Sequence, residues 1–423
     1  MRRTVLVSTC LTVMMVQIDT TIVNLGVHAI ESGLAVGVAA LQWVVDAYNL
    51  TYASLILPGG AIGDWLGRKR IFIAGLAVFT LACVACALAP NVGVLIAARS
   101  VAGAGAALAM PGSLAILTDA YRDAKERAQA TALWAGFNGV AIAIGPPAGG
   151  LLIHLFGWRS IFFLTVPVGG AAIVLAMVAV RAYKPNREAT LDAMSIVLSI
   201  VALGSFAFGA IEKTGWPYVV AATSVLAFVI RQARIAVPLL PLHFLRLRKF
   251  DAALTVAICM TFGMYAFLFG LPRYIQGTLH VDAIVTGWAL LPCGICFIAV
   301  APFAARIARH LGARGSIALG MAAIAAALAV AIFVAARGSV ALFAIAGGVS
   351  GIGMGIATGP LMTLGVSSLP AERSGTASGL VNMARMIGAT LGVAVLGGLP
   401  VETSMVYAAS IELAGVAAAY AFA

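Results

Sequence analysis

Long apolar runs, separated by short polar stretches, make up most of the chain. Each run is close to the roughly 20 residues that an α-helix needs to cross the hydrocarbon core of a bilayer. Strands of a membrane barrel would be about half as long and would alternate apolar and polar side chains. The pattern therefore predicts fourteen helical spans. Their approximate cores are 5–29, 42–62, 71–90, 93–117, 131–155, 160–181, 191–211, 217–235, 252–275, 284–306, 315–335, 339–364, 375–398 and 403–422.

Composition supports the same interpretation. The chain is 62% apolar and 10% charged, whereas an ordinary soluble domain is about 25% charged. A soluble protein of this composition would expose large apolar patches to water, and only helices or closed barrels satisfy their backbone polar groups inside lipid. The first span carries Asp19 and Asn24 and lacks an evident cleavage site, so we do not expect a removed signal peptide. We predict an all-α integral membrane protein.

The placement of cations predicts the orientation of the chain in the membrane. With the N-terminus in the cytoplasm, twenty of the 26 Lys and Arg residues fall in cytoplasmic segments and four fall outside, at Arg159, Lys213, Arg273 and Arg337. This excess follows the positive-inside rule and places both termini in the cytoplasm. The net charge of +11 is spread over many short loops. We therefore expect a lipid bilayer around the protein and no nucleic-acid partner.

A weak internal repeat divides the chain. Residues 63–75 resemble 308–320, and residues 126–131 resemble 372–377. The spacing exceeds what six helices and their loops require, and two further helices would fill the difference. The predicted organisation is a six-helix bundle at 1–185, two linking helices at 186–238 and a second six-helix bundle at 239–423.

Five ionisable residues fall inside predicted spans. An ionisable side chain near the bilayer centre costs about 2.5–3.5 kcal/mol on insertion scales, so each is a functional candidate, for proton coupling or substrate contact. The five are Asp19, Asp46, Arg99, Arg385 and Glu412.

Asp19 is the favoured proton site of these five. Burial favours its neutral form and a nearby cation favours its charged form, so a carboxyl group held between the two effects can load and unload a proton. The structural alternative is that neighbouring polar residues of the same helix satisfy a buried Asp.

The other four candidates also have structural alternatives. Asp46 lies near the outer end of its helix and could stabilise the helix start. Arg99 could form a purely structural ion pair. Glu412 could face a cavity or pair with Arg385, which in turn could contact substrate.

The segment at 60–70 forms a short charged loop between two spans. Glycines permit close approach and a tight turn, and Asp64 ends a helix opposite the start of the span at 375–398. A carboxylate at a helix N-terminus gains about 0.3–1 kcal/mol from the macrodipole, so Asp64 could latch the two halves together. The cations could instead be simple topology anchors. The gating residues are predicted to be Gly60, Asp64, Gly67, Arg68, Lys69 and Arg70.

Two further sets concern packing and the cavity. Glycines and a proline in the span at 131–155 allow close helix packing and a bend, or are ordinary small-residue packing. These are Gly139, Gly145, Pro146, Gly149 and Gly150. Aromatic residues with one amide could line an apolar pocket, or face lipid or the core. These are Trp134, Phe137, Asn138, Phe262, Tyr265 and Phe269.

Several motifs resemble those of the major facilitator superfamily, in its fourteen-helix drug:proton antiporter branch. Residues 60–70 match the pattern G-x-x-x-D-x-x-G-R-K-R, and similar matches are IDTTIVNL at 18–25, QWVVDAYNL at 42–50 and GPPAGG at 145–150. The resemblance implies two six-helix bundles joined by two linking helices and proton-driven export of lipophilic drugs. It also implies a proton-relay or acid-pairing role for Arg99, and a seal against leak at 145–150.

Four positions depart from the pattern of that branch. His28 replaces a Pro, Trp65 an Arg and Ala102 a Gln, and Arg273 occupies a normally apolar position. These departures bear on coupling and substrate rather than on the fold.

The sequence offers no catalytic set. It contains no phosphate-binding GxxxxGK[ST] loop, and its five histidines are scattered. The six cysteines lie in predicted spans, so their CxxC spacings are interpreted as packing, without disulfides or a metal. We expect a monomeric exporter in a bacterial cytoplasmic membrane that needs no cofactor and uses the proton gradient. The alternative is a proton symporter or facilitator of a metabolite with the same fold.

Overall fold

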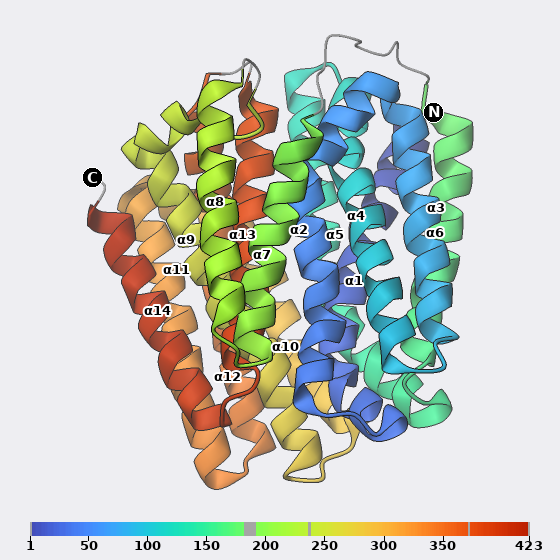
Figure 1. The fold of residues 1–423 in the computed structure, drawn as a ribbon, viewed down its shortest axis with the longest axis vertical. Coiled ribbons are helices and arrows are strands. Elements are labelled where there is room, and N and C mark those ends of the chain that lie inside the picture. Colours follow the sequence, from blue (N-terminus) through green and yellow to red (C-terminus); the bar gives the residue numbers. More distant parts are fainter. Residues whose placement is uncertain (1, 182–191, 236–237, 371–372, 422–423) are drawn as a thin grey trace.

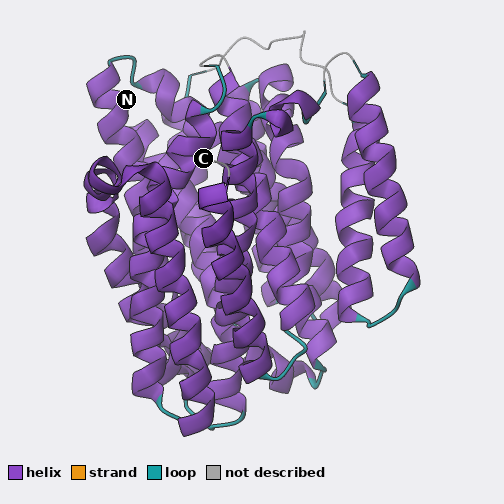
Figure 2. Cartoon of the chain, turned by 90° about the vertical axis from the view of Figure 1, so that its left-hand side faces the viewer, coloured by secondary structure: helices purple, strands orange, loops and turns teal. Residues whose placement is uncertain are grey.

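The computed structural model describes residues 2–181, 192–235, 238–370 and 373–421, and these form fourteen α-helices and two short 3-10 helices (Figure 1). Figure 2 shows helices joined by short loops. The α-helices are α1 (Arg2–Leu34), α2 (Val38–Leu66), α3 (Arg68–Ala87), α4 (Val92–Ala120), α5 (Ala124–Phe156), α6 (Ser160–Ala179), α7 (Ala193–Ile211), α8 (Trp216–Arg234), α9 (Arg248–Gly277), α10 (Ala283–Val300), α11 (Ala304–Arg337), α12 (Val340–Ser367), α13 (Ser374–Leu396) and α14 (Val401–Ala421). The 3-10 helices are η1 (Leu242–Arg246) and η2 (Ala301–Phe303).

The helices are those of a multi-pass membrane protein. Eleven helical stretches are long and apolar enough to cross a membrane, and one of them, Ala283–Arg337, contains both α10 and α11. Neither α2 nor α14 is among the eleven. In α2, buried polar residues such as Gln42, Asp46 and Asn49 lower the hydropathy. The all-α membrane fold is confirmed, while fourteen crossings stays a prediction.

One helix differs from its predicted bounds. The predicted spans at 284–306 and 315–335 leave a short gap between them, whereas α11 runs from Ala304 through that gap to Arg337. The helix kinks at Gly312, whose φ is 73° and ψ 164°. Gly67, at the same position in the internal repeat, has φ 102° between α2 and α3. Both angles lie in the region that favours glycine, so the two repeats share this turn.

The two halves pack their helices in the same pairs. In the first bundle, α1 contacts α5 and α6, α4 contacts α2 and α3, and α3 contacts α6. In the second, α9 contacts α13 and α14, α12 contacts α10 and α11, and α11 contacts α14. Each pair of the second bundle corresponds to a pair of the first. This correspondence supports the division at 185 and 238, which stays a prediction.

The bundles meet along two main seams. Helix α5 packs on α10, and α2 packs on α13, while α1 and α9 also touch. Helix α7 covers the α2–α13 seam and packs on both helices, with α8 on its outer side (Figure 1). Leu50, Ala207, Ile211 and Ala394 form an apolar cluster there, so α7 joins both bundles. The α5–α10 seam has no such covering helix among the described residues.

A polar network holds α7 to α8. Arg231 of α8 donates to both carboxylate oxygens of Asp192, at 2.6 to 2.9 Å, and this pairing lowers the pKa of Asp192 to about 2. Gln232 donates to the Ser195 hydroxyl at 2.6 Å and accepts from the Leu240 amide at 2.9 Å. The chain leading from α8 to the second bundle is thus tied to α7.

Candidate transport pathway

Asp19 and Arg99 form a buried ion pair in the first bundle. Arg99 Nη1 of α4 lies 2.6 Å from Asp19 Oδ2 of α1, and the two side chains are 1% and 0% exposed. Arg99 Nε donates to the Val44 carbonyl at 3.1 Å, and its guanidinium lies 4.4 Å from the centre of the Tyr48 ring. These contacts offset the desolvation of the two charges. The sequence marked both residues, and the resemblance implied that Arg99 pairs with an acid, but Asp19 was not named as its partner.

The pair is enclosed by one bundle. Beyond Arg99, the polar neighbour of Asp19 among the described residues is Cys83 of α3, at 4.0 Å. Gln17 and Thr21, which line the central cavity, lie on the opposite face of α1. Asp19 therefore does not reach the cavity in this structure, and its hydrogen-bond partners, Arg99 and Cys83, both belong to the first bundle.

A small cavity lies where the two bundles meet. Its volume is about 50 Å³, and its polar lining includes Thr21, Asn138, Thr261, Tyr265 and Arg385. Ligand sites for drug-sized molecules are about 300–1,000 Å³, so the cavity must widen before it holds one. The Nε of Arg385 has no hydrogen-bond partner in the described part of the chain. It supplies a cation at the centre of the molecule.

Two of the six predicted cavity residues, Asn138 and Tyr265, line this cavity. Trp134 instead donates to the Ser113 hydroxyl of α4 at 3.3 Å. The backbone of Phe262 lies against Gly392 of α13, and the ring of Phe269 lies against Gly397, the C-cap of α13. Both residues are buried in the close contact between α9 and α13. Phe137 is half-buried and is not part of the lining.

Glu412 does not pair with Arg385, contrary to one of its predicted alternatives. It is fully buried on α14, beside Gly263 of α9, and neither carboxylate oxygen has a partner among the described residues. It does not line the central cavity. Its surroundings, which include Cys259 and Met321, belong to the second bundle.

Asp46 is likewise fully buried with both oxygens unpartnered. Asn49, one turn further along α2, is near it, but the two side chains make no hydrogen bond of acceptable geometry. The alternative that Asp46 caps the start of α2 does not hold, because α2 begins two turns earlier, after Gly37.

The charged loop forms a network inside the first bundle. Arg68 bridges Asp64 and Asp119, with 2.7 Å to each carboxylate, and Lys69 donates to the Met177 carbonyl at 2.8 Å. A Cβ added at Gly375, in the first turn of α13, would meet no atom within 4 Å. Among the described side chains, which do not include that of Ser374, no hydrogen bond joins Asp64 to α13, so the predicted latch is not formed by them. Arg70 is exposed, and Gly60 touches Pro111 of α4 loosely.

The glycines of α5 serve two different contacts. Gly145 and Gly149 face Thr21 and Ile22 of α1, within the bundle, and leave no room for a methyl group. Gly139 and Gly150 face α10 across the seam, and the Pro146 carbonyl faces Gly287 of α10. Backbone meets backbone along this seam, as small residues allow.

Polar contacts between the bundles gather at one end of the molecule. We call the end that carries Arg2, Arg68 and Arg122 the basic end, and the opposite one the far end. At the far end Gln42 of α2 donates to the Val393 carbonyl of α13 at 2.7 Å, and Gln276 of α9 donates to the Leu25 carbonyl of α1 at 3.0 Å. In the described part of the chain, no hydrogen bond joins the bundles at the basic end.

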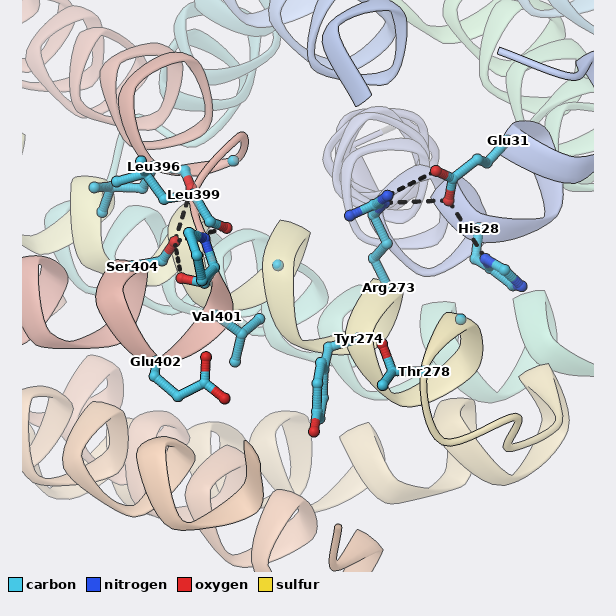
Figure 3. A pocket seen from close by; sticks show the side chains of 14 residues that line it. His28, Glu31, Arg273, Tyr274, Thr278, Leu396, Leu399, Val401, Glu402 and Ser404 are labelled. Atoms are coloured by element: carbon cyan, nitrogen blue, oxygen red, sulfur yellow. Dashed lines mark hydrogen bonds and ion pairs between the residues drawn. The ribbon is translucent and has the colours of Figure 1, made fainter. Parts of the chain in front are cut away.

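Two charge clusters complete the far-end contact. Arg273 of α9 reaches Glu31 of α1 through hydrogen bonds of 2.7 and 3.1 Å, and His28 Nδ1 lies 3.4 Å from the same carboxylate (Figure 3). His154 of α5 lies 3.0 Å from Asp282, the N-cap of α10. Two of the unusual sequence positions, His28 and Arg273, thus meet on one carboxylate.

His28, Glu31 and Arg273 also border a vestibule of about 480 Å³ (Figure 3). Glu402 and Ser404 line its other side. Sequence reasoning missed Glu31, because its partner Arg273 lies 242 residues away along the chain.

The sequence matches the family described as Major Facilitator Superfamily over residues 9–393. The chain belongs to this superfamily. It is 33% identical to the "Multidrug resistance protein Stp" of Mycobacterium tuberculosis (strain CDC 1551 / Oshkosh) over 93% of this chain and 74% of that one. It is 34% identical to the "Methylenomycin A resistance protein" of Bacillus subtilis (strain 168), over 93% and 86%.

A third relative is the "Tetracenomycin C resistance and export protein" of Streptomyces glaucescens, 30% identical over 91% of this chain and 73% of that one. Among solved structures, a POT family transporter in complex with 5-aminolevulinic acid has a TM-score of 0.72 at 11% identity, covering 96% of this chain and 94% of that one. At that identity the likeness concerns the fold alone. As a member of this transporter superfamily the chain is not an enzyme, and it needs no organic cofactor.

Proposed function

We propose that this protein is a proton-coupled secondary transporter that exports lipophilic drugs or antibiotic-like compounds by alternating access. The observation that carries the proposal is the similarity, over more than 90% of this chain, to three bacterial drug-resistance proteins. It is supported by a small cavity at the meeting point of two bundles of corresponding helix pairs.

The basic end faces the cytoplasm of a bacterial inner membrane in this proposal, with both termini on that side. The distribution of Lys and Arg supports this orientation. The far end is then the outer side, and its cross-bundle hydrogen bonds hold the outer side closed. Export requires these bonds to break and the bundles to rock, which the superfamily's two-bundle design permits. The protein acts as a monomer.

The substrate site is the central cavity. Asn138, Tyr265 and Arg385 supply polar groups beside several Met and Leu side chains of the lining, and such a mixed lining suits lipophilic compounds. The cavity widens when the basic end parts. Near that end the contact between α2 and α13 is apolar, with Leu57 against Gly379. Asp64 is free to leave Arg68 for the start of α13 when that end closes.

Energy comes from the proton gradient, at about 2.3 kcal/mol for each charge moved across 100 mV. The alternative, a proton symporter or facilitator of a metabolite, has the same fold and is separated from export by the direction of proton movement.

Everted membrane vesicles test this directly. The vesicles are energised so that the lumen is acid, and puromycin or ethidium is added as a probe. An antiporter makes the lumen more alkaline as the probe enters, and a symporter makes it more acid. Vesicles from cells without the protein are the control. No probe-dependent change in pH across a panel of lipophilic compounds would overturn the proposal.

A further inference from the structure

A group of buried polar side chains lies on the α2–α13 seam with nothing to bond to. Asp46 and Asn49 of α2 and Thr390 of α13 are 0%, 1% and 0% exposed. No polar side-chain atom of these three residues has a hydrogen-bond partner among the described residues. Buried polar groups in native proteins are nearly always satisfied, so a set of three without partners needs a physical explanation.

The register of the seam brings these residues together. Gln42 bonds to the carbonyls of Val393 and Ala394, and Leu57 lies against Gly379. The two contacts are fifteen residues apart on each helix, and the helices are antiparallel. Asp46 follows Gln42 by four residues on α2. Thr390 precedes Ala394 by four residues on α13. Because α-helical residues three or four apart share a face, Asp46 and Thr390 face each other across the seam.

The charge on Asp46 has no counterion. Helix α7, which covers the seam, has no titratable side chain between Ala193 and Ile211, and α13 has only Arg385, whose side chain lines the central cavity. On the α4 side, Arg99 is already paired with Asp19. An ionised, unpaired carboxylate in such a place costs several kcal/mol. Asp46 is therefore protonated when the seam is closed.

Asp19 differs from Asp46 in both respects. It is paired with Arg99, and its hydrogen-bond partners lie in one bundle. When the bundles rock as units, Asp19 keeps these partners, whereas the surroundings of Asp46 on the seam are rebuilt. A group couples proton binding to a conformational change only if the two states treat its charge differently.

We propose that Asp46, with Asn49 and Thr390 beside it, is the proton-carrying site of this transporter. The inference rests on the proposed function, since it names the residue that couples export to proton entry. Water reaches Asp46 when the Gln42 bonds break and the far end opens, and a proton then binds to its carboxylate. The seam closes over the neutral acid. The proton leaves toward the basic end when Leu57 and Gly379 separate and water hydrates Asn49 and Asp46.

Proteoliposomes containing Asp46→Asn test the inference, with ethidium as the probe. The variant mimics the protonated acid, so the far end can close without a proton. We expect ethidium to move down its own gradient at all pH values, while ethidium-driven proton movement falls to that of empty liposomes. Ser54→Ala is the matched control, because Ser54 is also buried on α2 without a partner. It should keep wild-type proton movement.

The outcomes separate the two proposals. If wild-type protein moves no protons with any probe, the proposed function fails. If wild type moves protons and Asp46→Asn moves them equally with the same pH dependence, the proton site is wrong. If Asp46→Asn does not bind ethidium, Asp46→Glu provides the test instead. It should keep coupling with a midpoint shifted to higher pH, since Glu is the slightly weaker acid, and an unshifted midpoint would also overturn the inference.

Discussion

The two seams between the bundles are built from different material, although the internal repeat makes them equivalent. Along the α5–α10 seam, glycines on both helices bring backbone against backbone, as where Gly294 meets Ala143 and Gly287 meets the Pro146 carbonyl. Along the α2–α13 seam, Asp46 and Thr390 are buried without partners, and α7 covers the outside.

This difference separates two tasks of a rocking transporter. The glycine seam packs closely, and its ionisable contact, His154 with Asp282, lies half-exposed at the far end, so the packed part of this seam suits a pivot that excludes water. The polar seam contains groups whose burial depends on their protonation. In the proposed mechanism the two equivalent seams therefore have different roles. The α5–α10 seam gives mechanical support, and the α2–α13 seam responds to protonation.

The ion pair of Asp19 and Arg99, inside the first bundle, provides a comparison for both seams. Asp19→Asn or Arg99→Gln alone should lower stability by about 3–5 kcal/mol, because each leaves a buried charge without its partner. The double variant should recover much of this loss. Thermal unfolding in detergent measures it. A double variant that is stable yet has lost all proton coupling would return the proton-carrying role to Asp19.

The seams themselves are compared by a matched pair of substitutions. In Gly294→Ala, the new methyl group would overlap the backbone of Ala143, at a cost of roughly 1–3 kcal/mol. In Gly379→Ala, it would meet only the end of the Leu57 side chain, at 2.7 Å.

Leu57 can move aside, and alanine favours a helix over glycine by up to about 1 kcal/mol. We therefore expect Gly379→Ala to be close to neutral, with transport retained, and Gly294→Ala to lose both stability and transport. Equal losses for the two variants in unfolding and ethidium efflux would contradict the distinction between the seams.

The far-end charge pair should have a smaller effect. Arg273→Gln removes a partly exposed pair with Glu31, worth about 0.2–1 kcal/mol, and so favours far-end opening about 1.5- to 5-fold. A membrane-impermeant maleimide reports this as faster labelling of Thr278→Cys, which lines the vestibule. Glu31→Gln combined with Arg273→Gln should label no faster than Arg273→Gln alone, and additive rates would show that the two residues act separately.

The smallest effect is expected at Thr390. Thr390→Val keeps the shape of the side chain and removes one polar group facing Asp46. The seam then becomes less favourable for an ionised Asp46, and the pH midpoint of ethidium transport should rise by a few tenths of a unit, since 1.36 kcal/mol corresponds to one unit. Thr363→Val, on α12 away from the seam, is the control, with an unchanged midpoint expected.

Sequence alone determined the membrane class, the approximate position of each helix and the tight turn at Gly67. Apolar length and glycine conformation act over one or two turns of chain, so their pattern is visible in local sequence. The same reasoning marked Asp19, Asp46 and Arg99, because a charge in an apolar run is costly wherever the helix packs.

Only the tertiary structure decided which of these charges is paired and which stands on a moving seam. Asp46 and Thr390 are 344 residues apart, and their meeting depends on the register of two helices from different bundles. Likewise His28 and Arg273 became neighbours only through Glu31. Helix packing depends on the shapes of many side chains from distant segments at once, and no local pattern contains that information.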